Sequence, residues 1–504
     1  SNNVAFGQNA MADNTTGGTN SSFGVSALRA NTTGGNNVAI GYESLKANTT
    51  ASNNTALGTS SLRQNTTGGS NVAMGQAALD ANTTGANNTA IGRLTLYGNT
   101  TANDSTAVGY AALTSATTGG KNVGVGVSAL VAVTTGDQNT ALGHHAGKGI
   151  TTASYCIAIG KNTLTAASGN SCVAIGHMAL EDNTGADNVA IGRQALYENT
   201  TGTGHVAVGL EALEKNTTGN DNIAIGKRAL EENTTGDNNT AMGRSALESA
   251  TTADNNTAIG FYALLYTTTG ADNTAVGKGA LQANTTASYN TAVGLHAMYA
   301  NTTGASNTAV GINALDANTT ASNNTAVGAN VLTANTTGAQ NTALGTSALA
   351  ANTTASYITA VGYNALASQT TGVNNSAFGS TAGDSITTGS YNVAVGNNAL
   401  TSLTTNNYNV AIGNNSQIYA SGSYNTSIGA EALEGVQDSS TGNANTAIGF
   451  RSLEDYTTGH NNVAIGYQAG YQITTGHENV AIGSAALDAL TTGNDHVAVG
   501  YAAL

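Results

Sequence analysis

The chain has 504 residues, and its composition excludes several classes of protein. It contains 64 Gly, no Pro and no Trp, and only 8% of its residues are charged and 5% aromatic. So few large side chains cannot build conventional globular cores, whereas 40% hydrophobic residues in strict order argue against disorder. The net charge of −14 comes from scattered Asp and Glu, which argues against nucleic acid and membrane surfaces as partners.

A short repeat fills the whole chain. Its marker is a Gly at residue 7, 24, 41 and onward to 500, which gives 30 copies. Of the 29 intervals, 25 are 17 residues, three are 16 and one is 20. With this Gly as position 5, the consensus is N-T/V-A-I/V-G-x-x-A-L-x-x-N-T-T-G-x-x. We expect a single continuous array over 1–504, taken from a longer chain because both ends fall inside a repeat.

Each repeat predicts short strands and a turn. Positions 2 to 4 are β-branched or aliphatic residues around a small one, which is Ala in 27 copies, and this alternation is typical of a strand. Ala-Leu at positions 8 and 9 suits a second strand, and Asn-Thr-Thr-Gly is turn chemistry. Two helices and their turns do not fit in 17 residues. The sequence therefore predicts an all-β parallel β-solenoid or β-roll of about 30 coils.

Positions 1 and 3 of the repeat predict how coils stack on one another and how chains could associate. Asn occupies position 1 in 24 copies and is expected to form a ladder of side-chain amides between coils. The small residue at position 3 is opposite in phase to positions 2 and 4. An outward Ala stripe would pack against the same stripe of other chains, which suggests a homo-oligomer. The alternative is that Ala fits a tight interior, with Val or Thr facing outward.

Three coils exchange two residues in a matched way. Position 9 is Gly instead of Leu or Met, and position 12 is then Ile instead of Asn. The pairs are Gly147 with Ile150, Gly383 with Ile386, and Gly470 with Ile473. Close packing accounts for the pairing if the Ile fills the volume that the Leu leaves. Positions 9 and 12 are therefore predicted to face one narrow core.

Two segments are irregular, 161–192 and 414–449, and an unusual pair of residues lies just before and within the first. Cys156 and Cys172, the only cysteines, replace the position-1 Asn in consecutive coils. Stacked coils would hold their Cα atoms ~4.8 Å apart, within reach of a disulfide. Two interpretations stay open, a possible disulfide that closes one coil and a pair of free thiols.

The phrases "NNVAIGYESL" and "NVAIGYQAGYQ" resemble the head repeats of YadA-type trimeric autotransporter adhesins. That resemblance covers nearly all repeats and implies a left-handed parallel β-roll wound as a homotrimer. The "NTAIG…AL…NTTG" form also resembles repeats in the shafts of bacteriophage tail fibres. This chain departs from the adhesin head in its 17-residue repeat and its longer corner.

No catalytic, cofactor or metal motif is found, so we expect no enzyme, no cofactor and no metal site. Adjacent His144 and His145 should point to opposite faces, which is poor chelating geometry, and His205 and His496 replace the position-1 Asn. Asn-Thr-Thr could accept glycans in a secretory setting or serve as corner hydrogen-bonding groups. The Thr doublets leave one outward column, a weak basis for ice binding.

The expected function is that of a structural and adhesive extracellular fibre on a cell or virion surface. It would self-associate as a homotrimer and display its variable positions to a host-cell surface or matrix ligand. One alternative is the shaft of a bacteriophage tail fibre. Another is a monomeric ice- or glycan-binding solenoid, which predicts a single chain in solution.

Overall fold

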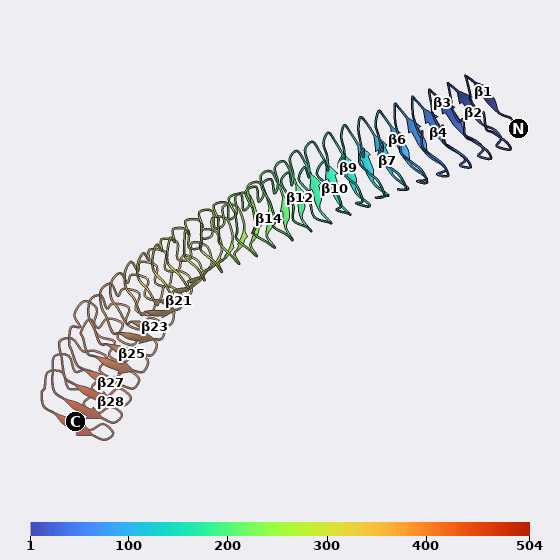
Figure 1. The fold of residues 1–504 in the computed structure, drawn as a ribbon. Helices are drawn as coiled ribbons and strands as arrows, with labels where there is room; N and C mark the ends of the chain where they lie inside the picture. Colours follow the sequence, from blue (N-terminus) through green and yellow to red (C-terminus); the bar gives the residue numbers. More distant parts are fainter. Residues whose placement is uncertain (1) are drawn as a thin grey trace. The chain divides into compact units, whose positions relative to one another are not determined.

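The computed structural model describes residues 2–504 and is all-β, a parallel β-solenoid of about 29 turns with a 17-residue repeat. Each coil contributes one three-residue strand, and successive coils lie side by side (Figure 1). The chain divides into two compact units, Ser1–Asp254 and Asn255–Leu504.

The first unit holds fifteen strands, all of them positions 2 to 4 of a repeat. They are β1 (Val4–Phe6), β2 (Ser21–Phe23), β3 (Val38–Ile40), β4 (Thr55–Leu57), β5 (Val72–Met74), β6 (Thr89–Ile91), β7 (Thr106–Val108), β8 (Val123–Val125), β9 (Thr140–Leu142), β10 (Ile157–Ile159), β11 (Val173–Ile175), β12 (Val189–Ile191), β13 (Val206–Val208), β14 (Ile223–Ile225) and β15 (Thr240–Met242).

The second unit holds the remaining strands, at the same positions of the repeat. They are β16 (Thr257–Ile259), β17 (Thr274–Val276), β18 (Thr291–Val293), β19 (Thr308–Val310), β20 (Thr325–Val327), β21 (Thr342–Leu344), β22 (Thr359–Val361), β23 (Ser376–Phe378), β24 (Val393–Val395), β25 (Val410–Ile412), β26 (Thr426–Ile428), β27 (Thr446–Ile448), β28 (Val463–Ile465), β29 (Val480–Ile482) and β30 (Val497–Val499).

Within each unit, neighbouring strands pair in parallel, and each residue pairs with the equivalent residue of the next repeat. Ile40 of β3, for example, is the register partner of Leu57 of β4, and Leu57 is that of Met74 of β5. Equivalent side chains of successive coils therefore stack on one another at the inter-strand spacing of ~4.8 Å. Any property of one repeat position becomes a continuous column along the unit.

The structure decides which face of the strand looks inward. Position 3 is buried, and positions 2 and 4 face outward; Ala39 is 0% exposed and Ile40 is 39% exposed. The prediction of an outward Ala stripe is wrong, and the alternative of a tight interior holds. The physical reason is the narrow coil, because a Cβ on Gly124, the only Gly at position 3, would lie 3.3 Å from Leu113 Cγ. Only a small residue fits opposite the position-9 Leu.

The predicted second strand at positions 8 and 9 is absent among the described residues, where a turn follows each strand. The backbone takes the left-handed conformation at positions 7 and 9, as at Glu43 (φ 55°) and Leu45 (φ 50°). Ladder bonds continue through the turn, since Leu45 N–H donates to Ser61 O at 2.9 Å. A positive φ is least tolerable for β-branched residues, which accounts for Leu or Met at position 9 in place of Ile or Val.

The marker Gly is required by both conformation and space. Gly41 has φ 133°, and a Cβ there would lie 2.5 Å from the carbonyl oxygen of Gly58 in the next coil. The same close approach recurs between Gly58 and Gly75 at 2.6 Å. No side chain can stand between these backbones, so position 5 fixes how closely the coils stack.

The three exchanged coils have matched geometry. Ile150 is 0% exposed, and its Cδ1 lies 3.2 Å from where a Cβ on Gly147 would be. The corresponding distances are 3.0 Å for Ile386 beside Gly383 and 3.0 Å for Ile473 beside Gly470. Each Ile therefore occupies the space above its Gly, inside the core that positions 3 and 9 share.

Candidate functional site: the strand face and the asparagine columns

The outward face of the strands carries no charge and is apolar at position 4, with Thr, Ser, Val or Ile at position 2. Position 4 is Ile, Val, Leu, Met or Phe in all 30 repeats, and position 2 is Thr, Val, Ile or Ser. Most position-4 side chains are more than a third exposed, for example Leu57 at 40% and Ile91 at 39%. We call the column of position-2 and position-4 side chains of β1–β30 the strand-face stripe.

The strand-face stripe is larger than an ordinary scatter of exposed apolar residues. Register pairing places Met74, Ile91 and Val108 on three successive strands, and the same holds along each unit. Contiguous apolar surface free of charge marks interaction sites, because interface cores are depleted of charged residues. This face repeats in every coil, and its position-4 side chains remain half-exposed or exposed throughout the described chain.

Asn at position 1 bonds to backbone groups of the neighbouring coils. Asn54 Oδ1 accepts the backbone N–H of Asn71 at 2.9 Å, and its Nδ2 donates to Gly68 O at 3.0 Å. The expected ladder therefore exists, but it runs from side chain to backbone more than from amide to amide. These amides close the corner that follows each Thr-Thr turn.

A second column of buried Asn lies at position 12, which was predicted to face the core, but the hydrogen bonds between its amides were not predicted. Asn48 Nδ2 donates to Asn31 Oδ1 at 2.9 Å in the preceding coil and to Ala51 O at 3.0 Å in its own. Asn48 is 0% exposed, as are the other position-12 Asn from Asn31 onward. These are the Asn of the Asn-Thr-Thr sequences, and from Asn31 onward their burial leaves no such amide open to a glycan in the folded coils.

The two cysteines lie one above the other in the position-1 column. Both are 0% exposed and carry free thiols. Each takes over part of the Asn role, with Cys156 Sγ 3.4 Å from Gly169 O and Cys172 Sγ 3.3 Å from Gly185 O. A hydrogen bond between the thiols lowers the pKa of Cys156, and the same bond together with burial raises that of Cys172. The disulfide stays a prediction.

The histidines occupy two kinds of place. His144 and His145 do not point to opposite faces as predicted; their rings lie 3.8 Å apart between centroids, because positions 6 and 7 form a turn and not a strand. His205 is buried in the position-1 column, where Nδ1 accepts the backbone N–H of Asn222 at 3.2 Å. Burial lowers the pKa of His205, because the charged ring would lose its hydration.

Two groups of three carboxylates have the geometry that could hold a metal ion, but an Arg already forms an ion pair with each group. They are Glu211, Glu214 and Glu231, and Glu431, Glu434 and Glu454. Arg228 Nε lies 3.0 Å from Glu211 Oε2, and Arg451 Nε lies 2.6 Å from Glu431 Oε2. Burial raises the pKa of Glu454 to about 7. Both groups are ion-pair networks on the surface of the coils.

Over residues 2–504 no helix is both long and apolar enough to cross a membrane. No protein-family model and no curated protein matches this chain.

Proposed function

We propose that this chain is a structural and adhesive fibre segment that self-associates, as a homotrimer, through the strand-face stripe. The observation that carries the proposal is the uncharged stripe, whose position-4 side chain is apolar and half-exposed or exposed in every coil. Its residues recur at the coil spacing of ~4.8 Å, so the surface that matches it along its whole length has the same spacing. A second copy of the chain meets that condition.

The stripe also replaces the earlier basis for oligomerisation. Position 3 was expected to form the contact between chains, but the chain buries its own Ala there. The proposed contact therefore moves to positions 2 and 4, where Val, Ile and Thr side chains bury apolar area worth about 25 cal/mol per Å². A cell or virion surface, reached with the variable turn residues outward, is the proposed location.

Sedimentation velocity tests the proposal. The wild-type chain is expected to sediment as three times its 49.8 kDa mass. Ile191→Lys with Ile225→Lys places two charges on the stripe and is expected to yield monomers, since an unpaired buried charge is costly. The matched control is Thr84→Lys with Thr118→Lys, which adds the same charge at exposed corner positions and should leave the trimer intact. A monomeric wild type overturns the proposal.

A further inference from the structure

Position 10 is the column in which charge varies most along the chain. In three consecutive coils it is Arg29, Lys46 and Arg63, three of only 14 basic residues in a chain of net charge −14. Elsewhere the same position is often acidic, as at Glu214, Glu231 and Glu248. The three cations therefore form a local basic ladder, one charge per coil.

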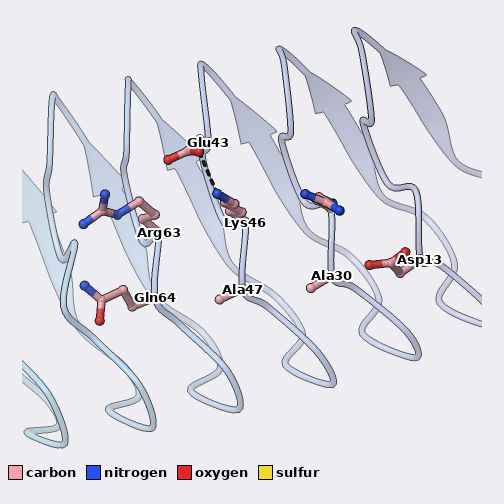
Figure 2. Close-up of a pocket in the computed structure, with 8 residues that line it drawn as sticks. Asp13, Ala30, Glu43, Lys46, Ala47, Arg63 and Gln64 are labelled. Atoms are coloured by element: carbon pink, nitrogen blue, oxygen red, sulfur yellow. Dashed lines mark hydrogen bonds and ion pairs between the residues drawn. The ribbon is translucent and has the colours of Figure 1, made fainter.

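A groove of about 520 Å³ runs along this basic ladder. Figure 2 shows its side chains rising from the segment that follows the strand in each coil. Asp13 and Gln64 stand at its two ends, and Ala30 and Ala47 leave its middle open. Glu43 also lines the groove beside Lys46, so over four coils its three cations face two carboxylates, with space for a ring-sized group above the Ala residues.

The cations of the groove are not all neutralised. Lys46 Nζ lies 2.6 Å from Glu43 Oε1, and Arg63 lies 2.9 Å from Asp80 Oδ2. Arg29 is exposed and makes no side-chain hydrogen bond or ion pair with the described residues. The bond from Lys46, and the charges of Lys46 and Arg63, hold the pKa of Glu43 below its ordinary value, as expected in a positive local field.

We infer that this groove binds a linear acidic polysaccharide, with successive carboxylates held by Arg29, Lys46 and Arg63. The coil rise of ~4.8 Å is close to the length of one sugar unit, so consecutive charges can meet consecutive coils. Arg binds carboxylates in a bidentate manner, and Asp13 and Gln64 offer acceptors to sugar hydroxyls. No aromatic side chain lines the groove among the described residues, so it lacks the stacking platform of a single-stranded nucleic-acid site.

The inference names a ligand class for the proposed adhesive function and rests on that function. The groove itself is formed by one chain and does not require the trimer. The test is binding of the full chain to immobilised polygalacturonate, a linear polymer with one carboxylate per sugar, measured by biolayer interferometry. Binding is expected, and it should weaken as salt rises. Arg29→Gln with Lys46→Gln should lower the affinity about tenfold or more, because each removes a hydrogen bond to a charged group.

The matched control is Lys148→Gln, the same change at position 10 of a coil outside the groove, which should bind as wild type does. Equal binding to neutral dextran, stronger binding to single-stranded oligonucleotide, or an unchanged affinity in the double variant would each overturn the inference. Sedimentation of the same samples separates the two proposals: trimers that do not bind polygalacturonate refute the ligand class alone, and monomers that bind it refute the trimer alone.

Discussion

The two asparagine columns look alike in the sequence but tolerate different replacements. Position 1 is replaced in all but one case by a residue with a hydroxyl, thiol or ring nitrogen, and position 12 mostly by apolar residues. The position-1 replacements are Ser105, Cys156, Cys172, His205, Ile358 and His496. The position-12 replacements include Ala116, Val133, Ile150, Ala250, Ile386, Leu403, Ala420, Tyr456, Ile473 and Leu490.

Their hydrogen-bond partners explain the difference. A position-1 amide bonds to two backbone groups, which no mutation can remove. Its loss leaves the buried N–H of the next coil without a partner, whereas the carbonyl keeps the bond from the position-12 Asn, as Gly68 O does from Asn65. A position-12 amide bonds largely to another position-12 amide, and removing both together is nearly neutral. At three interruptions of the position-12 column, the Asn before the interruption has an Oδ1 without a partner among the described residues. These are Asn99, Asn233 and Asn352, which precede Ala116, Ala250 and Gln369.

The largest expected effect tests the position-1 column. Asn54→Ala should lower the local unfolding free energy by about 4 kcal/mol, because the buried N–H of Asn71 loses its partner and the carbonyl of Gly68 keeps only the bond from Asn65 Nδ2. Amide hydrogen exchange of peptides from this region measures it. A loss no greater than that of the position-12 change Asn48→Ala would contradict the comparison.

The next effect tests whether volume governs position 12 where it is apolar. Ile150→Ala should cost about 3 kcal/mol by opening a cavity above Gly147. Adding Gly147→Leu should recover at least half of the loss, because Leu is the usual occupant of that space. Hydrogen exchange of the four variants of the cycle gives the coupling; additive effects would show that the two residues do not share the space.

A smaller effect separates the middle of the position-12 column from its end. Asn82→Ala removes three side-chain hydrogen bonds, one of them the bond that Asn82 Oδ1 accepts from Asn99 Nδ2 at 2.7 Å. Asn99→Ala removes only two, because Asn99 Oδ1 accepts none from the described residues. Asn82→Ala should therefore cost about 1 kcal/mol more than Asn99→Ala. Thermal unfolding and local hydrogen exchange compare the two variants. Equal losses of unfolding free energy would show that the amide-to-amide bond adds nothing to stability.

The smallest effect is a pH dependence at His205. Its folded pKa lies below the ordinary value of 6.5, so the unfolded chain takes up the proton first. The contribution of the ring is complete above pH 6.5 and is lost as the pH falls through the folded pKa. His205→Asn restores the usual residue and should abolish this loss, as exchange in the 200–225 region at pH 7 and pH 5 would show. The same acid sensitivity in the variant would assign it to other groups.

The repeat let the sequence predict the strands, their parallel stacking and the position-1 ladder. It could not predict which strand face is inside, because a period of two is symmetric between faces. The choice depends on the width of the coil, which Leu113 and Gly124 reveal only once the turn is known. That turn was missed because a Leu with positive φ, such as Leu45, is uncommon.

The candidate sites divide in the same way. The sequence shows that positions 2 and 4 carry no charge, but it does not show that their side chains are exposed. Position 12 was predicted to face the core from the Gly and Ile exchanges, but the bonds between its Asn amides were missed because Asn-Thr-Thr is also common in exposed turns. The basic ladder could have been found by aligning Arg29, Lys46 and Arg63 on the repeat, although the space between them depends on the fold.

The left-handed residue at position 9 has a consequence for engineering. In all four coils whose length departs from 17 residues, it keeps its conformation, at Leu164 (φ 49°), Leu180 (φ 52°), Gln417 (φ 52°) and Leu433 (φ 52°). Residues are gained or lost only after it, as in the longer loop at 435–443. The first nine residues of a coil thus have a constant length, and the remaining eight, which we call the arm, can vary in length. A foreign peptide grafted into that arm, one per coil, would be displayed at a regular spacing of ~4.8 Å.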